Sequence, residues 1–96
     1  MKTKDEIIDL LKKHKKEISE RFAVRAVGLF GSYARGAASA ASDIDVLVEF
    51  DEPTFDHYMD LKFYLEKLLG SEVDLILADS MKPRLKPYVE KDMIYA

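Results

Sequence analysis

A chain of 96 residues and 11.0 kDa has room for one domain with a modest core, which excludes a catalytic domain joined to a separate specificity domain. Hydrophobic residues make up 48% and charged residues 34%, which excludes a disordered chain, and the absence of cysteine excludes disulfides and thiolate chemistry. The net charge of -3 argues against a generic nucleic-acid binder. We therefore expect residues 1–96 to form a single domain, with a radius of gyration of about 12.5 Å.

Hydropathy and charge also bear on location. No apolar run approaches the roughly 18 residues of a membrane span, and the first eleven residues mix Lys, Asp and Glu with aliphatic residues, unlike a signal peptide. We therefore expect a cytoplasmic protein with no membrane partner. The charge is uneven along the chain: residues 1–25 hold eight Lys or Arg and five Asp or Glu, whereas residues 43–79 hold eleven acidic residues and two Lys.

The first half of the chain predicts a helix followed by two strands. Residues 3–22 carry apolar residues at helical spacing, and Thr3 with Glu6 matches a capping box. Residues 24–30 read as a strand that ends at Gly31, and residues 32–42 as one helical turn followed by a loop. Residues 43–50 alternate between aliphatic and mostly acidic side chains, which is typical of a strand with one buried face.

The second half predicts a helix, a strand and a short C-terminal helix. Residues 54–69 form the second long helix, with Phe55 among its apolar residues and Gly70 as its C-cap. Residues 72–77 read as a strand, Pro83 as the start of a short helix, and residues 92–96 as a brief edge strand. This order predicts an α/β (α+β) domain: a small mixed β-sheet with helices mainly on one face.

Three carboxylates are expected on the face of this sheet that the helices leave open. Asp43 and Asp45 are two residues apart on one strand, so their side chains point the same way, and Asp74 has the same facing on another strand. Neighbouring carboxylates repel each other unless a cation neutralises them. An all-oxygen ligand set suits Mg²⁺, and three such residues can hold two ions about 3.5–4 Å apart. The alternative is that these carboxylates only face solvent.

Gly31 and Ser32 stand where a strand turns into a helix. Glycine permits close backbone approach, and free N–H groups at a helix start, with the Ser32 hydroxyl, suit phosphate binding. An ordinary turn with a serine cap is the alternative reading of these two residues.

Taken together, Gly31-Ser32, ten further residues and then Asp43-Ile44-Asp45 resemble the signature of the polymerase β-type nucleotidyltransferase superfamily. The local sequences 31–36 and 42–48 are very similar to those of the minimal nucleotidyltransferases, and Val73-Asp74-Leu75 matches the strand that carries the family's third carboxylate. The resemblance covers nearly the whole chain and implies the nucleotidyltransferase fold.

The resemblance also implies roles for these residues. Gly31 and Ser32 would hold the β- and γ-phosphates of an NTP such as ATP, Asp43 and Asp45 would ligate Mg²⁺, and Asp74 would complete the metal site and help to deprotonate the acceptor hydroxyl. Arg35 belongs to the same local pattern and would either contact phosphate or substrate, or anchor the turn through an ion pair.

The implied activity is Mg²⁺-dependent transfer of NMP, AMP in the first instance, from an NTP to a hydroxyl. Minimal members are often antitoxins that adenylylate a tyrosine of a helical HEPN-type ribonuclease, so a HEPN-type toxin is the expected partner. The alternative is a non-catalytic antitoxin that masks its partner. An antibiotic-type transferase is disfavoured because no chain remains for a drug pocket. A basic cluster near the C-terminus could meet triphosphate, RNA or an acidic partner, or could be a solvated helix face; it comprises Lys82, Arg84 and Lys86.

Overall fold

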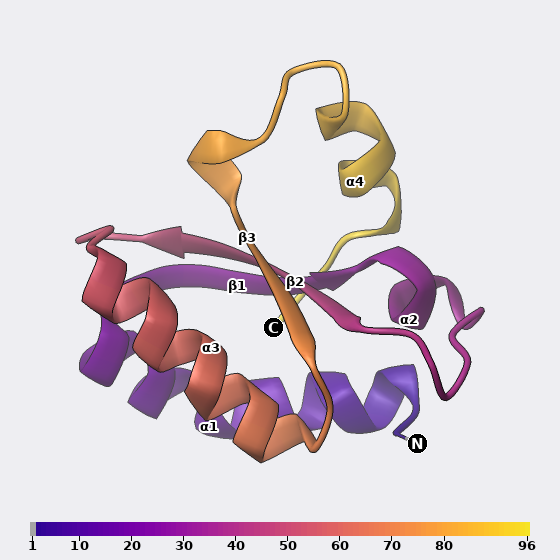
Figure 1. The fold of residues 1–96 in the computed structure, drawn as a ribbon, viewed down its shortest axis with the longest axis horizontal. Coiled ribbons are helices and arrows are strands. Elements are labelled where there is room, and N and C mark those ends of the chain that lie inside the picture. The colour runs from indigo at the N-terminus through magenta and orange to yellow at the C-terminus, as the bar shows by residue number, and fades with distance from the viewer. Residues whose placement is uncertain (1) are drawn as a thin grey trace.

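The computed structural model describes residues 2–96 as a four-stranded sheet with two long helices on one face and a short helix on the other (Figure 1). The elements in chain order are α1 (Lys4–Phe22), β1 (Val24–Phe30), α2 (Gly31–Arg35), β2 (Ile44–Phe50), α3 (Phe55–Leu69), β3 (Val73–Leu77), the 3₁₀ turn η1 (Ala78–Ser80), α4 (Lys86–Asp92) and β4 (Ile94–Tyr95). The radius of gyration is 12.4 Å, in agreement with the expected size.

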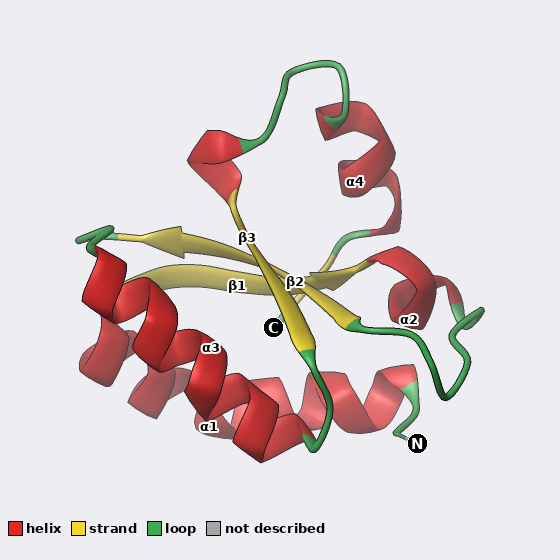
Figure 2. Cartoon of the chain, in the orientation of Figure 1, coloured by secondary structure: helices red, strands yellow, loops and turns green. Residues whose placement is uncertain are grey.

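The sheet is mixed, as the sequence predicts. Its strand order is β3-β2-β1-β4, in which β1 pairs antiparallel with both β2 and β4, and β2 pairs parallel with β3 (Figure 2). The parallel pair is possible because α3 connects the end of β2 to the start of β3, as a crossover helix must.

Local sequence signals set the helix ends. Thr3 and Glu6 form the predicted capping box: the Glu6 N–H donates to Thr3 Oγ1 at 3.2 Å, and the Thr3 N–H donates to Glu6 Oε1 at 3.0 Å. Thr54 caps the start of α3, and Gly70 ends that helix with a left-handed φ of 69°.

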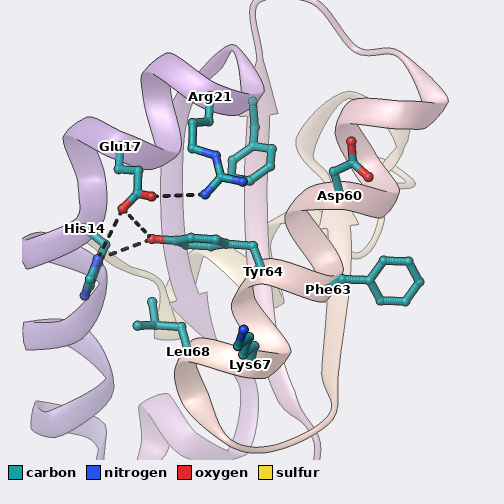
Figure 3. A pocket seen from close by; sticks show the side chains of 9 residues that line it. His14, Glu17, Arg21, Asp60, Phe63, Tyr64, Lys67 and Leu68 are labelled. Carbon is teal, nitrogen blue, oxygen red and sulfur yellow. Dashed lines mark hydrogen bonds and ion pairs between the residues drawn. The ribbon is translucent and has the colours of Figure 1, made fainter.

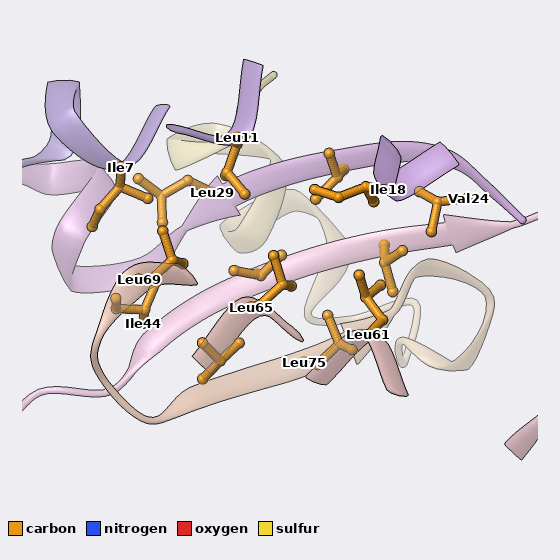
Figure 4. Close-up of a cluster of buried hydrophobic side chains, with 14 of the residues drawn as sticks. Ile7, Leu11, Ile18, Val24, Leu29, Ile44, Leu61, Leu65, Leu69 and Leu75 are labelled. Carbon is orange, nitrogen blue, oxygen red and sulfur yellow. The ribbon is translucent and has the colours of Figure 1, made fainter. Parts of the chain in front are cut away.

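The core lies between the sheet and the two long helices (Figure 4). α1 contributes a stripe of residues at helical spacing, α3 contributes a second stripe, and β1, β2 and β3 contribute the side chains that face them. The completely buried members include Ile7, Leu11, Ile18, Leu29, Ile44, Val46, Val48, Leu61 and Leu65. Burial of this row of β2 turns the alternate residues of the strand, Asp45 among them, to the opposite face.

A polar stripe of α3 covers the outer edge of β3. Tyr58 donates its hydroxyl to the Leu75 carbonyl at 2.6 Å, and Lys62 Nζ donates to the Val73 carbonyl at 3.1 Å. The Val73 N–H in turn donates to Glu66 Oε2 at 3.1 Å. These three α3 residues are four positions apart, so they lie on one side of the helix and satisfy backbone groups that no strand pairs.

The structure corrects three expectations. The last helix begins at Lys86 rather than at Pro83, because residues 83–85 form a turn, closed by the Lys86 N–H donating to the Pro83 carbonyl at 3.3 Å, before the helix starts. Phe55 does not join the core, since 76% of it is exposed. The second sheet face is partly covered, because α4 and η1 lie over it and leave Leu47 only 5% exposed. Among residues 2–96, no helix is long and apolar enough to span a bilayer.

Candidate active site

Gly31 lies directly against the carboxylate of Asp45. Its φ of 74° is left-handed, and a Cβ placed on it would collide with Asp45 Oδ2 and lie 2.9 Å from Asp45 Cγ. Both features require glycine at the point where β1 ends and α2 begins. The turn formed by Gly31 and the half-buried Ser32 is therefore placed beside one of the three candidate carboxylates.

The sheet register brings the carboxylates together. Asp45 of β2 and Asp74 of β3 are paired positions of the parallel ladder, so their side chains leave the sheet on the same side. Asp43 precedes β2 by one residue and is exposed, as is Asp74, whereas Asp45 is half-buried.

Electrostatics single out Asp45 within this group. Burial raises the pKa of its carboxyl, and the negative charges of Asp74 and then Asp43 raise it further, while the positive charge of Arg35 opposes them. The negative charges of Asp43 and Asp74 therefore act on Asp45, whose ionised form is less favourable in the folded protein than in water.

This donor set fits a hard divalent cation. All candidate ligands are carboxylate oxygens, which suits Mg²⁺, and their mutual repulsion is the condition that a bound cation relieves. Within residues 2–96, no three acidic or histidine side chains lie close enough together to hold a metal ion by themselves. Phosphate oxygens and water would have to complete the coordination, as is usual for Mg²⁺ in nucleotide-dependent enzymes.

The sequence did not decide whether Arg35 anchors its turn through an ion pair, and the structure shows such a pair. Its Nη1 donates to Asp92 Oδ2 at 3.1 Å, so the last residue of α2 is tied to the last residue of α4. About half of the Arg35 side chain remains exposed, and its positive charge acts to lower the pKa of Asp45. Asp92 is the residue that sequence reasoning missed: it lies 57 positions from Arg35, and no local pattern links the two.

A wide hollow lies elsewhere, between α1 and α3 on the far face of the sheet, with a volume of about 840 Å³ (Figure 3). At its wall the Tyr64 hydroxyl donates to Glu17 Oε2 at 3.0 Å and lies 3.2 Å from His14 Nδ1, while Arg21 Nη1 donates to Glu17 Oε1 at 3.0 Å. Burial and Glu17 raise the pKa of Tyr64. This network joins the two helices, and none of the candidate site residues lines the hollow.

Comparison with known proteins identifies relatives along almost the whole chain. The nucleotidyltransferase domain model matches residues 11–96. The protein adenylyltransferase MntA of Thermococcus cleftensis is 46% identical over 96 residues, which cover 99% of this chain and 97% of the relative.

Solved structures also resemble this chain along most of its length. A candidate minimal nucleotidyltransferase superposes with a TM-score of 0.74 at 35% identity, over 91% of this chain and 93% of the other. A crystal structure described as a toxin–antitoxin with AMP-PNP superposes with a TM-score of 0.67 at 27% identity, over 96% of this chain and 70% of the other. The predicted fold class is thereby confirmed. The chain belongs to the nucleotidyltransferase domain family and is a nucleotidyltransferase of the minimal type.

Proposed function

We propose that this protein transfers AMP from ATP to a hydroxyl group of another protein in an Mg²⁺-dependent reaction. The observation that carries the proposal is the contact between Gly31 and Asp45, because it supports a site in which the Gly31-Ser32 turn would bind phosphate beside the carboxylates that would hold the metal. We further propose that residues 1–96 act as one domain, since a single buried cluster draws side chains from α1, β1, α2, β2, α3 and β3.

Each candidate residue has a role in this scheme. Gly31 and Ser32 bind the β- and γ-phosphates, because the glycine lets the backbone approach them and the serine adds a hydroxyl donor. Asp43, Asp45 and Asp74 are the ligands of Mg²⁺, two ions if all three take part. Bound Mg²⁺ supplies charge neutralisation at the phosphoryl oxygens and the leaving pyrophosphate.

Asp74 has a second role at the acceptor. It is the exposed carboxylate on the edge strand, where it can take the proton of the attacking hydroxyl. The acceptor oxygen forms a bond to the α-phosphorus of ATP while the bond to the bridging oxygen breaks, and pyrophosphate leaves. Arg35, held by Asp92, contributes positive charge next to the phosphate-binding turn.

The relatives support the choice of acceptor. One is named a protein adenylyltransferase, and a structural neighbour is a toxin–antitoxin with bound AMP-PNP, a non-hydrolysable ATP analogue. We therefore propose that the acceptor is a tyrosine of a HEPN-type helical toxin and that this chain is its antitoxin. We place the reaction in the cytoplasm, consistent with the cysteine-free sequence.

The test separates catalysis from masking. The protein is incubated with labelled ATP, Mg²⁺ and the HEPN-type protein of the same two-gene pair, and the product is examined by intact-mass and peptide mass spectrometry. An AMP increment on tyrosine, and a toxin that stays silent after this chain is removed, are expected. Neutralisation without any increment, undiminished in Asp74→Asn, would establish the masking alternative instead.

A further inference from the structure

A basic and aromatic strip runs along the segment between β3 and β4. All of its side chains are exposed, with 47% of Leu85 and 74% of Tyr88 accessible to solvent. The strip consists of Lys82, Arg84, Leu85, Lys86, Tyr88 and Lys91.

Nothing within the described part of the chain uses these side chains. The ion pairs found among residues 2–96 involve none of the four cations of the strip, and α4 has no buried residue. Within residues 82–91, Glu90 is the one acidic residue, in a protein whose net charge is -3. An unpaired cluster of positive charge around two exposed apolar side chains needs an explanation beyond folding.

The strip lies on the same side of the sheet as the candidate active site. α4 covers part of the sheet face toward which Asp45 points, and the ion pair between Asp92 and Arg35 fixes its last residue to α2 (Figure 1). Lys82 and Arg84 lie in the loop that precedes α4, at the end of the helix remote from α2 (Figure 1). The strip therefore leads away from the site along the seven residues of α4, beginning at the end opposite to the one that Asp92 ties to Arg35.

An acidic protein surface fits this strip better than RNA does. Exposed Leu85 and Tyr88 require an apolar counterpart, which a protein surface provides and a phosphodiester backbone does not.

We propose that the strip is the docking surface for the protein acceptor, whose complementary surface carries acidic residues around an apolar centre. Docking there presents the acceptor hydroxyl to the site at the other end of α4. This inference rests on the proposed function, because it presumes that the acceptor is a protein.

The experiment compares two triple variants that change the charge equally. Lys82→Glu, Arg84→Glu and Lys86→Glu are combined in one, and Lys12→Glu, Lys13→Glu and Lys16→Glu, exposed on α1, serve as the control. Affinity for the HEPN-type protein is measured by calorimetry at low and high salt, and AMP transfer is followed in parallel. For the apolar centre, Leu85→Ala with Tyr88→Ala is compared with Phe55→Ala and Phe63→Ala, the exposed aromatic residues of α3.

The strip variant should lose at least about tenfold in affinity and transfer rate at low salt, and less at high salt, since steering by charge changes association rates by about 10- to 1000-fold. The KM for ATP should not change, and the α1 control should behave like the wild type. Equal affinity of the two triple variants would overturn the proposal.

Two further measurements distinguish a protein partner from RNA, and failure of docking from failure of catalysis. Poly-L-glutamate should compete with the acceptor in the wild type but not in the strip variant; stronger competition by a single-stranded RNA would make the strip an RNA site and overturn the proposal. If the wild type binds the acceptor through the strip but transfers no AMP, the proposed catalysis fails while the docking surface stands.

Discussion

Gly31 and Asp45 are packed so closely that no side chain fits between the turn and the carboxylate. Gly31→Ala must therefore either displace Asp45 or distort α2, and it must also place alanine at a φ of 74°, which costs about 1–2 kcal/mol. We expect loss of AMP transfer and a melting temperature several degrees below that of the wild type.

Gly36 provides a matched control, because its φ is 72° but nothing lies within 4 Å of the position of a Cβ. Gly36→Ala should show the conformational cost alone, with transfer retained. If both variants lose the same stability and the same activity, the contact with Asp45 has no consequence.

Asp45→Asn should abolish transfer yet stabilise the fold at neutral pH. The pKa of this carboxyl is raised in the folded protein, so its contribution favours the folded state at low pH and is lost as the pH rises through that pKa. The variant should thus be more stable than the wild type near pH 7, and the difference should vanish below the carboxyl pKa. Urea melts across this range, without metal, measure it; a lower stability at pH 7 would mark Asp45 as structural.

Glu66 should show the opposite pH dependence. The hydrogen bond from Lys62 and then that from the Val73 N–H lower the pKa of Glu66, so its stabilisation is present above the unfolded-state pKa and is lost as the pH falls through the lower folded value. Glu66→Gln should cost about 1 kcal/mol at pH 7, typical of a hydrogen bond to a charged group that is partly exposed. Glu20→Gln, on the exposed side of α1, should cost nothing, and a pH-independent loss in Glu66→Gln would show that charge is not involved.

Arg35 and Asp92 should behave as a pair. Since both side chains are partly exposed, their coupling in stability should be below about 1 kcal/mol. If Arg35 acts only by anchoring α4, Arg35→Ala and Asp92→Ala should reduce transfer equally and the double variant no further. If Arg35 also contacts phosphate, its variant alone should raise the KM for ATP; a double-mutant cycle in steady-state kinetics decides between these roles.

Binding of ATP and of Mg²⁺ should be linked. The repelling carboxylates should hold Mg²⁺ weakly alone, and more strongly when phosphate oxygens complete its coordination. Calorimetry should give much tighter ATP binding with Mg²⁺ than with a chelator, and the difference should disappear in Asp43→Asn. Equal affinity for ATP with Mg²⁺ and with a chelator would show that nucleotide binding does not involve the metal.

The sequence predicted most of this fold because its signals are local. Period-two alternation marked β2 and β3 within one residue of their bounds, and Thr3, Thr54 and Gly70 marked helix ends. The same alternation predicted that Asp45 and Asp74 share a face, and the ladder register places them side by side.

What could not be predicted depends on distant parts of the chain. The contact of Gly31 with Asp45 follows from the register of β1 against β2, in which Phe30 is opposite Asp45. The partner of Arg35 depends on how α4 folds back over the sheet. Pro83 gave a wrong helix start because proline suits the turn that it begins here as well as a first helical turn.

The polar stripe of α3 also limits how this protein can assemble. Tyr58, Lys62 and Glu66 bind the Val73 N–H and the Val73 and Leu75 carbonyls on the outer side of β3, and at the other edge β4 has only two residues. A foreign strand would therefore have to displace these three bonds to pair with β3, and it finds only a very short ladder at β4. Both features oppose strand addition and edge-to-edge aggregation, so we expect complexes of this chain to form through side-chain surfaces.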